Sequence, residues 1–204
     1  LYFTFFSTLF AYNFIKYFEY IYANYDSISI KLKFIAYASI FSLFFSLFFL
    51  FKLALNEVLL IALISIITLL YAVPFFLFSD TNLRSVRGLK IYVVALVWTM
   101  TVVLLPFEFY TELGLLFLII NFIQIFIYVL IAIVPFEIRD INIDNKRLST
   151  IPQKIGIKNT KILGVLLCLL FLLIELLKQK YFSWYYLGFD FIVISLLMMF
   201  LIIN

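Results

Sequence analysis

Long runs of apolar residues, separated by short polar stretches, organise the chain. Seven runs lie near residues 1–22, 34–51, 57–78, 91–107, 113–135, 160–177 and 182–203. Each is close to the roughly 20 residues that an α-helix needs to cross the hydrocarbon core of a bilayer. The strands of a transmembrane barrel would be much shorter and would alternate with polar residues. The pattern therefore predicts an all-α fold, a polytopic transmembrane helix bundle of about seven spans.

Composition leads to the same class of protein. Apolar residues make up 67% of the chain and charged residues 13%. A soluble domain of this size cannot bury so much apolar surface, whereas lipid can solvate it, so we predict an integral membrane protein. The first run has neither a basic region before it nor a small-residue cleavage site, which favours a fragment of a longer protein over a signal peptide. We expect residues 1–204 to form a single transmembrane domain.

Basic residues divide unequally between the two sides that the seven runs define. Twelve of the fifteen Lys and Arg residues lie on one side, and only Lys52, Lys178 and Lys180 lie on the other. Basic loops stay in the cytoplasm, so the basic side is predicted to be cytoplasmic and the membrane to be the inner, cytoplasmic one.

The densest group of charges lies between the fifth and sixth runs, from Pro135 to Gly156. If the fifth helix continues, Asp140 and Asp144 share one helix face, with Glu137 one turn before them. Such carboxylates at a membrane boundary suit Mg²⁺, which uses few protein carboxylates together with substrate phosphates. The same stretch supplies cations for an anionic ligand: Arg139, Lys146, Arg147 and Lys154. The alternative interpretation is a solvated loop between two membrane helices.

Two other polar groups are predicted at cytoplasmic helix ends. Asn13 and Lys16 share a face near the end of the first run, where polar side chains are costly in hydrocarbon. Arg84, Arg87 and Lys90 are spaced three apart before the fourth run, so one helical turn would aim all three at a polyanion such as a diphosphate. Ordinary anchoring of basic residues to lipid phosphates is the alternative.

Single residues add narrower expectations. Pro135 is expected to end or kink the fifth helix, Pro152 to mark a turn, and Gly156 to permit a bend into the next helix. The single cysteine, Cys168, is expected to pack as a small hydrophobic residue. Histidine is absent from the sequence, which excludes His-based acid–base catalysis and His-ligated zinc.

Several stretches resemble the UbiA-type intramembrane prenyltransferases, and more closely a Bacteroidetes branch of that superfamily. They run from the first predicted span into the sixth, and consist of Tyr12–Tyr17, Tyr71–Phe75, Asn82–Arg84, Gly88–Trp98, Pro135–Asp140 and Thr150–Gly156. The resemblance implies a bundle of nine helices, of which this chain would lack the first and last. It also implies Mg²⁺ and the diphosphate of an isoprenyl donor, bound by two Asp-rich motifs.

Residue roles follow from the same resemblance. Asp140 and Asp144 match the second Asp-rich motif, as catalytic metal ligands, and Asn13 matches the first residue of the first motif. Arg84, Arg87 and Lys90 lie in the loop where the family places basic residues against the diphosphate. From spacing and charge alone, Glu137 would join the metal ligands, and Arg139 and Lys146 would join the diphosphate-binding residues. The acidic positions of the first motif are occupied here by Phe14, Tyr17 and Ile21.

The resulting hypothesis is a membrane prenyltransferase that transfers an isoprenyl group from its diphosphate to a lipophilic, aromatic acceptor. Its partners would be these two substrates and membrane lipid, with no nucleic acid. The first alternative is a catalytically inactive relative that binds an isoprenoid or quinone-like lipid, which the altered first motif favours. A small transporter is the second alternative, but it would place charges or broken helices at mid-membrane.

The charge bias makes a prediction about topology. A reporter fused after Asn145 should behave as cytoplasmic, and one fused after Glu112 as external, because basic loops are retained inside. Activity of paired cytoplasmic and periplasmic reporters at both positions measures this. The reverse pattern would invert the assignment of every predicted site.

Overall fold

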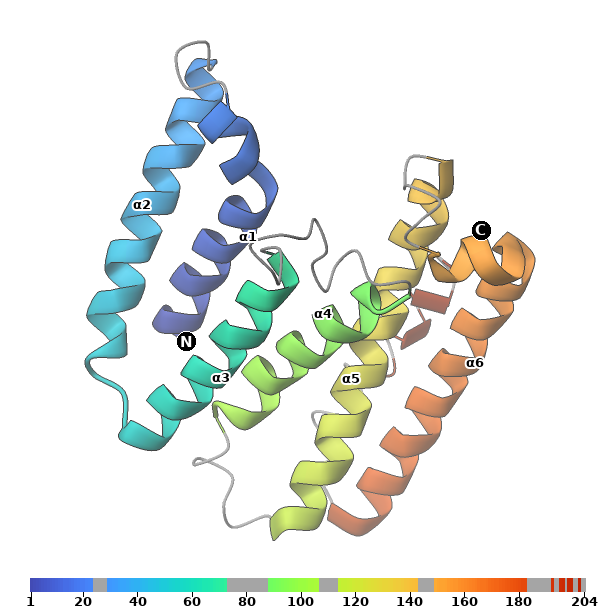
Figure 1. Ribbon diagram of the computed structural model, residues 1–204. Coiled ribbons are helices and arrows are strands. Elements are labelled where there is room, and N and C mark those ends of the chain that lie inside the picture. The colour runs from blue at the N-terminus through green and yellow to red at the C-terminus, as the bar shows by residue number, and fades with distance from the viewer. Residues whose placement is uncertain are drawn as a thin grey trace. The chain divides into compact units, whose positions relative to one another are not determined.

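The computed structural model describes residues 1–23, 29–72, 88–106, 114–142 and 149–182, together with Ile192, Ser195, Leu196, Met198, Met199 and Ile202 (Figure 1). Within these ranges nearly every residue is helical and there is no strand. The predicted all-α class is confirmed for this part of the chain. The chain divides into two compact units, Leu1–Ala62 and Leu63–Asn204.

The first unit is built on a helical hairpin. Helix α1 (Tyr2–Ala23) packs along α2 (Ile30–Leu50), and the first residues of α3 (Leu55–Ala72) follow. The Phe6 ring lies 5.2 Å from that of Phe45 and stacks on Phe49 at 6.0 Å, measured between centroids. Such aromatic pairs add to the packing energy beyond the area they bury.

The second unit continues from α3 through three packed helices. They are α4 (Lys90–Thr99) with a π-helical turn η2 (Met100–Leu104), α5 (Gly114–Arg139) with a 3-10 turn η4 (Asp140–Asn142), and α6 (Ile151–Phe182). Helix α5 packs against both α4 and α6, as Figure 1 shows. The core of this unit consists of Ile127, Ile131, Val134, Cys168, Phe171 and Ile202.

Close approach within this core depends on one glycine of α6. A Cβ added to Gly164 would lie 2.9 Å from the Ile202 side chain and 3.3 Å from Val134 Cγ1. Small residues at such contacts let transmembrane helices pack closely, which is their main source of attraction in lipid. Cys168 lies about one turn after Gly164 in α6 and is fully buried. This confirms the prediction that it packs as a small hydrophobic residue.

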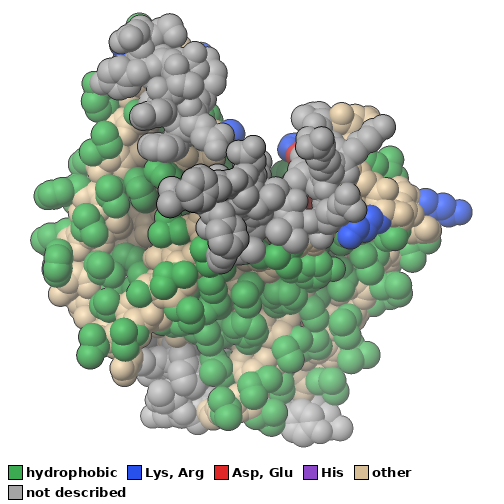
Figure 2. Space-filling model, in the orientation of Figure 1, with side chains coloured by type: hydrophobic (Ala, Val, Ile, Leu, Met, Phe, Trp, Pro, Cys, Tyr) green, Lys and Arg blue, Asp and Glu red, His purple; other side chains and the backbone are tan. Residues whose placement is uncertain are grey.

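Three helices of the described chain are long and apolar enough to cross a membrane: Ile30–Leu50, Gly114–Asn142 and Ile151–Lys178. Large hydrophobic side chains are widely exposed, and Figure 2 shows them covering much of the visible surface. The chain is therefore an integral membrane protein. Two further apolar helices, Leu55–Tyr71 and Lys90–Leu104, are shorter, so the predicted count of seven spans remains a prediction.

Three local expectations can be compared with the structure. Of the two outcomes predicted for Pro135, an end of the helix is wrong, because α5 continues to Arg139. Pro152 does not mark a turn before α6. It lies in the first turn of that helix, where its missing N–H leaves no intrahelical bond unmade. The bend predicted at Gly156 is confirmed, because its φ of 81° and ψ of 160° interrupt α6.

A buried polar network joins α5 to α6 inside their apolar surfaces. Glu175 Oε2 accepts a hydrogen bond of 2.6 Å from Gln124 Nε2, and Lys178 Nζ donates one of 2.7 Å to Gln124 Oε1. Lys178 Nζ also lies 3.3 Å from Asn121 Oδ1 and 3.6 Å from Glu175 Oε2. Gln124 and Glu175 are almost completely buried. Lys178, which the sequence pattern places in a loop after the sixth apolar run, is thus a helix residue with buried partners.

This network predicts how the helix pair responds to substitution. Lys178→Met should destabilise the protein by on the order of 3–5 kcal/mol, because it leaves the buried Glu175 carboxylate without a cation. A triple variant that also carries Glu175→Met and Gln124→Leu should recover most of the loss, since no buried charge or unmatched amide remains. Thermal unfolding in lipid nanodiscs measures both, with the exposed Lys158→Met as the control. If Lys178→Met unfolds at the wild-type temperature, the network does not contribute to stability in this way.

Candidate functional site

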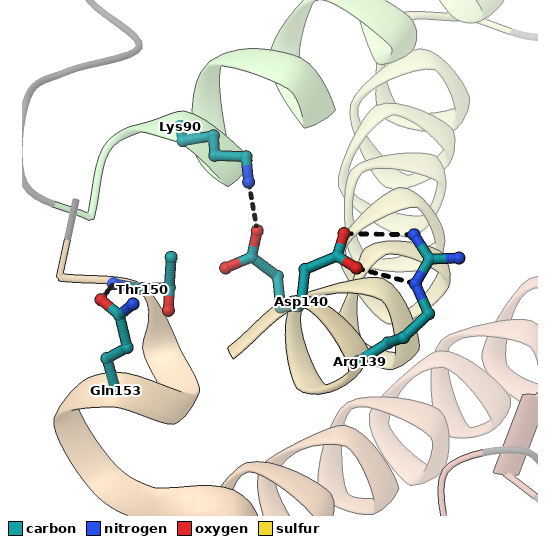
Figure 3. Close-up of polar contacts among 6 residues, drawn as sticks. Lys90, Arg139, Asp140, Thr150 and Gln153 are labelled. Carbon is teal, nitrogen blue, oxygen red and sulfur yellow. Dashed lines mark hydrogen bonds and ion pairs between the residues drawn. The ribbon is translucent and has the colours of Figure 1, made fainter. Parts of the chain in front are cut away.

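The second unit brings charged side chains together where α4 begins, α5 ends and α6 begins (Figure 3). Lys90, the first residue of α4, places its Nζ 3.0 Å from Oε1 of Glu137 in the last turn of α5. Glu137 is only 4% exposed. A buried carboxylate needs a cation to offset its lost hydration, and Lys90 supplies it.

Asp140 lies at the next turn of the chain and is paired with its neighbour. Arg139 donates two hydrogen bonds to it, from Nε to Oδ1 at 2.7 Å and from the guanidinium to Oδ2 at 3.1 Å (Figure 3). The arginine side chain is 68% exposed and the aspartate side chain 30%, so solvent screens this pair.

The α-helix that carries Glu137 ends at Arg139 and gives way to a 3-10 turn at Asp140. The expected shared face of Asp140 and Asp144 depended on a continuous α-helix, and that premise is wrong. Asp144 itself lies outside the described residues.

The start of α6 completes the site. The backbone N–H of Thr150 donates to Gln153 Oε1 at 3.1 Å, which is half of a capping box (Figure 3). In the full motif the Thr150 hydroxyl would in turn accept from the Gln153 backbone N–H. Instead, Thr150 Oγ1 is buried and has no hydrogen-bond partner among the described atoms.

A second lysine reaches the site from the same turn. Lys154 lies so close to Gly88 that a Cβ added to that glycine would be 2.8 Å from its Nζ. Gly88 has a φ of 72°, in the left-handed region where a side chain is strained. A glycine here therefore permits both the turn before α4 and the approach of the ammonium group.

These elements enclose a small pocket. It is lined by Gly88, Lys90, Ile91, Glu137, Thr150 and Ile151. Counting Lys154, Lys90 and Arg139 against Glu137 and Asp140, the described site has three cations and two carboxylates. An excess of cations favours an anionic ligand.

The oxygen donors of the site can be tested against Mg²⁺. Within the described ranges, no three His, Cys, Asp or Glu side chains lie close enough to form a complete metal site. Glu137 Oε2, however, is a buried carboxylate oxygen with no hydrogen-bond partner in the described chain. Asp140 adds partly exposed carboxylate oxygens. Two such groups suit a cation that takes its other ligands from water and phosphate.

The residues predicted for the site are only partly placed. Lys90, which lies far from Glu137, Arg139 and Asp140 in the sequence, is brought to them by the packing of α4 on α5. Asn13 belongs to α1 of the first unit. The remaining predicted residues lie outside the described part of the chain: Arg84, Arg87, Asp144 and Lys146.

Thr150 was missed as a site residue, although its signal is present in the sequence. Thr150 and Gln153 have the Thr-x-x-Gln spacing of a capping box, which marks a helix start directly before Pro152. The α5–α6 network was also missed. There, polar pairs three residues apart, Asn121 with Gln124 and Glu175 with Lys178, interrupt long apolar runs.

Comparisons with protein-family models, with curated proteins and with solved structures gave no match.

The two ion pairs of the site should respond differently when their basic residue is replaced. Lys90→Met should lower stability by about 3 kcal/mol, because the buried Glu137 loses its cation. Arg139→Ala should leave the unfolding temperature nearly unchanged, because this pair is exposed and screened. Thermal unfolding of both variants in nanodiscs measures the difference. Equal losses would show that burial does not distinguish the pairs.

Proposed function

We propose that this protein is an intramembrane prenyltransferase of the UbiA type, which transfers an isoprenyl group from its diphosphate to a lipophilic, aromatic acceptor. One observation carries the proposal. Lys90, Glu137, Asp140 and the start of α6 come from separate stretches of the sequence and meet at one end of apolar membrane helices. A charged site at the edge of an apolar helix bundle matches a substrate with an anionic head and a hydrocarbon tail.

The cations of the site would act on the diphosphate. When the bond between the allylic carbon and the diphosphate oxygen breaks, negative charge grows on the leaving group. Lys90 and Lys154, held by α4 and α6, would stabilise that charge with little reorganisation during the reaction. Arg139 offers a planar guanidinium that binds phosphate oxygens in pairs.

Mg²⁺ would supply further neutralisation of the diphosphate and of the leaving group. Asp140 and Asp144 would hold it, and Glu137 would reach it through one of the metal's bound waters. For Asp140 this means exchanging its exposed arginine partner for the metal. Glu137 keeps one oxygen on Lys90 and has the other unpaired.

The apolar helices would hold the rest of the donor. An isoprenyl tail has no polar group to satisfy, so it can lie among exposed Leu, Ile and Phe side chains at no cost in hydrogen bonds. The acceptor would be lipophilic for the same reason. Attack of the acceptor carbon on the allylic cation would form the new bond, and the acceptor would then lose a proton.

A catalytically inactive relative is the second candidate, and two observations favour it. Both described carboxylates of the site are already paired with basic side chains, and Phe14 and Tyr17 stand where the resembled family has acids. Such a protein would keep affinity for an isoprenyl diphosphate but would not stabilise the transition state more than the ground state.

Asp140 provides the test. Asp140→Ala should lower prenyl transfer by about a hundredfold if the carboxylate positions the metal, while protein levels stay near wild type. Transfer from a labelled isoprenyl diphosphate in membranes measures this, with chelation of Mg²⁺ as a parallel arm. Asn142→Ala, in the same 3-10 turn, is the matched control. Tight binding of a donor analogue without turnover in the wild-type protein would instead establish the inactive relative.

A further inference from the structure

Two residues that line one pocket of the site each have a buried oxygen atom without a hydrogen-bond partner in the described chain. The atoms are Glu137 Oε2, at the end of α5, and Thr150 Oγ1, directly before α6. Both residues are 4% exposed and both line the small pocket beside Lys90. These two are the only buried side-chain oxygens or nitrogens among the described residues that lack a partner. Leaving such an atom unpaired is costly, so two of them at one pocket indicate a ligand.

The chemistry of the two atoms restricts what the ligand can be. A carboxylate oxygen only accepts hydrogen bonds, whereas a hydroxyl can both donate and accept. The ligand must therefore donate to Glu137, and it can accept from Thr150 or donate to it. A bare cation at Glu137 Oε2 is disfavoured, because the Lys90 ammonium lies 3.0 Å from the other oxygen of the same carboxylate.

We infer that one water molecule occupies this pocket and bridges Glu137 to Thr150, which makes Thr150 a positioning residue of the site. Water is the smallest group that donates and accepts at once, and buried waters usually satisfy otherwise unpaired polar groups. It can be a free structural water or one carried in the hydration shell of Mg²⁺, which sheds its waters reluctantly. The second source rests on the proposed function, and the first does not.

The bridge explains why the Thr150 hydroxyl leaves its usual partner. In a capping box that hydroxyl would accept from the Gln153 backbone, yet here only the reverse bond, from the Thr150 backbone to Gln153, is made. A hydroxyl bonded to the bridging water would tie the start of α6 to Glu137. Through Glu137 it also steadies Lys90, the cation placed to bind an anion.

A double-mutant cycle tests the bridge, because no side-chain hydrogen bond joins Glu137 directly to Thr150. Thr150→Val keeps the shape of the side chain and removes the hydroxyl. It should lower the unfolding temperature of the protein in nanodiscs by about 2–4 °C, as expected for loss of one buried hydrogen bond in a chain of this size. Thr150→Ser, which keeps the hydroxyl, should remain within about 1 °C of wild type on the same scale.

The decisive arm is the Glu137→Met background. If a shared water couples the residues, Thr150→Val should cost almost nothing further there, whereas in a Lys90→Met background its cost should persist. An equal cost of Thr150→Val in all backgrounds would show ordinary helix capping and would overturn the bridge. These measurements need no substrate, so they can succeed or fail independently of prenyl transfer.

Two further arms identify the source of the water and guard against variants that do not fold. Coupling that survives EDTA indicates a free water, and coupling that appears only with added Mg²⁺ indicates a metal-bound one. Either result supports the bridge.

If Glu137→Met yields no folded protein, an experimental density map of the wild-type protein decides whether the water is present. Density within about 2.6–3.2 Å of both oxygens supports the water, and a direct bond from each oxygen to protein overturns it.

Discussion

The pairing of α5 with α6 is the contact on which the second unit depends. Lipid removes the hydrophobic drive that would hold two apolar helices together in water, so close packing and polar bonds must provide the attraction. Gly164 permits the packing, and Glu175 bonded to Gln124 provides the polar link. Between these points the Tyr128 and Phe171 rings lie 5.9 Å apart. Together they set the register of two antiparallel helices over several turns.

The charged site lies at the other end of the same pair. Once the register is set, the last turn of α5 and the start of α6 come to one place, and the bend at Gly156 turns the first residues of α6 out of line with the rest of the helix. The two polar regions differ in one physical respect. No buried atom of the α5–α6 network is among those left unpaired in the described chain, whereas Glu137 and Thr150 each have such an atom. A polar network whose hydrogen bonds are all made contributes to stability. A pocket that contains unpaired polar atoms indicates a ligand.

Prediction from the sequence succeeded where the local structure is decided by one residue or by the spacing of apolar residues. The apolar runs predicted helices because no other backbone arrangement satisfies its own hydrogen bonds within one segment in lipid. Gly156 predicted a bend because a positive φ is unstrained only without a Cβ. The same approach failed at Pro135 and Lys178. Helix α5 continues through Pro135 because packing of the surrounding helix can stabilise it there. Lys178 lies in α6 and is largely buried because Glu175 and Gln124 are its partners.

The sequence by itself determined that the chain is helical, that it belongs in a membrane, and that its charges gather between the fifth and sixth apolar runs. These properties follow from composition and period, which are local. Only the tertiary structure decided that Lys90 is the partner of Glu137 and that Thr150 lines the same pocket. It also decided that Asp140 begins a new turn rather than extending α5. Such facts depend on which helices pack against each other. The helical period of a sequence shows which residues share a face of one helix, but not which other helix that face contacts.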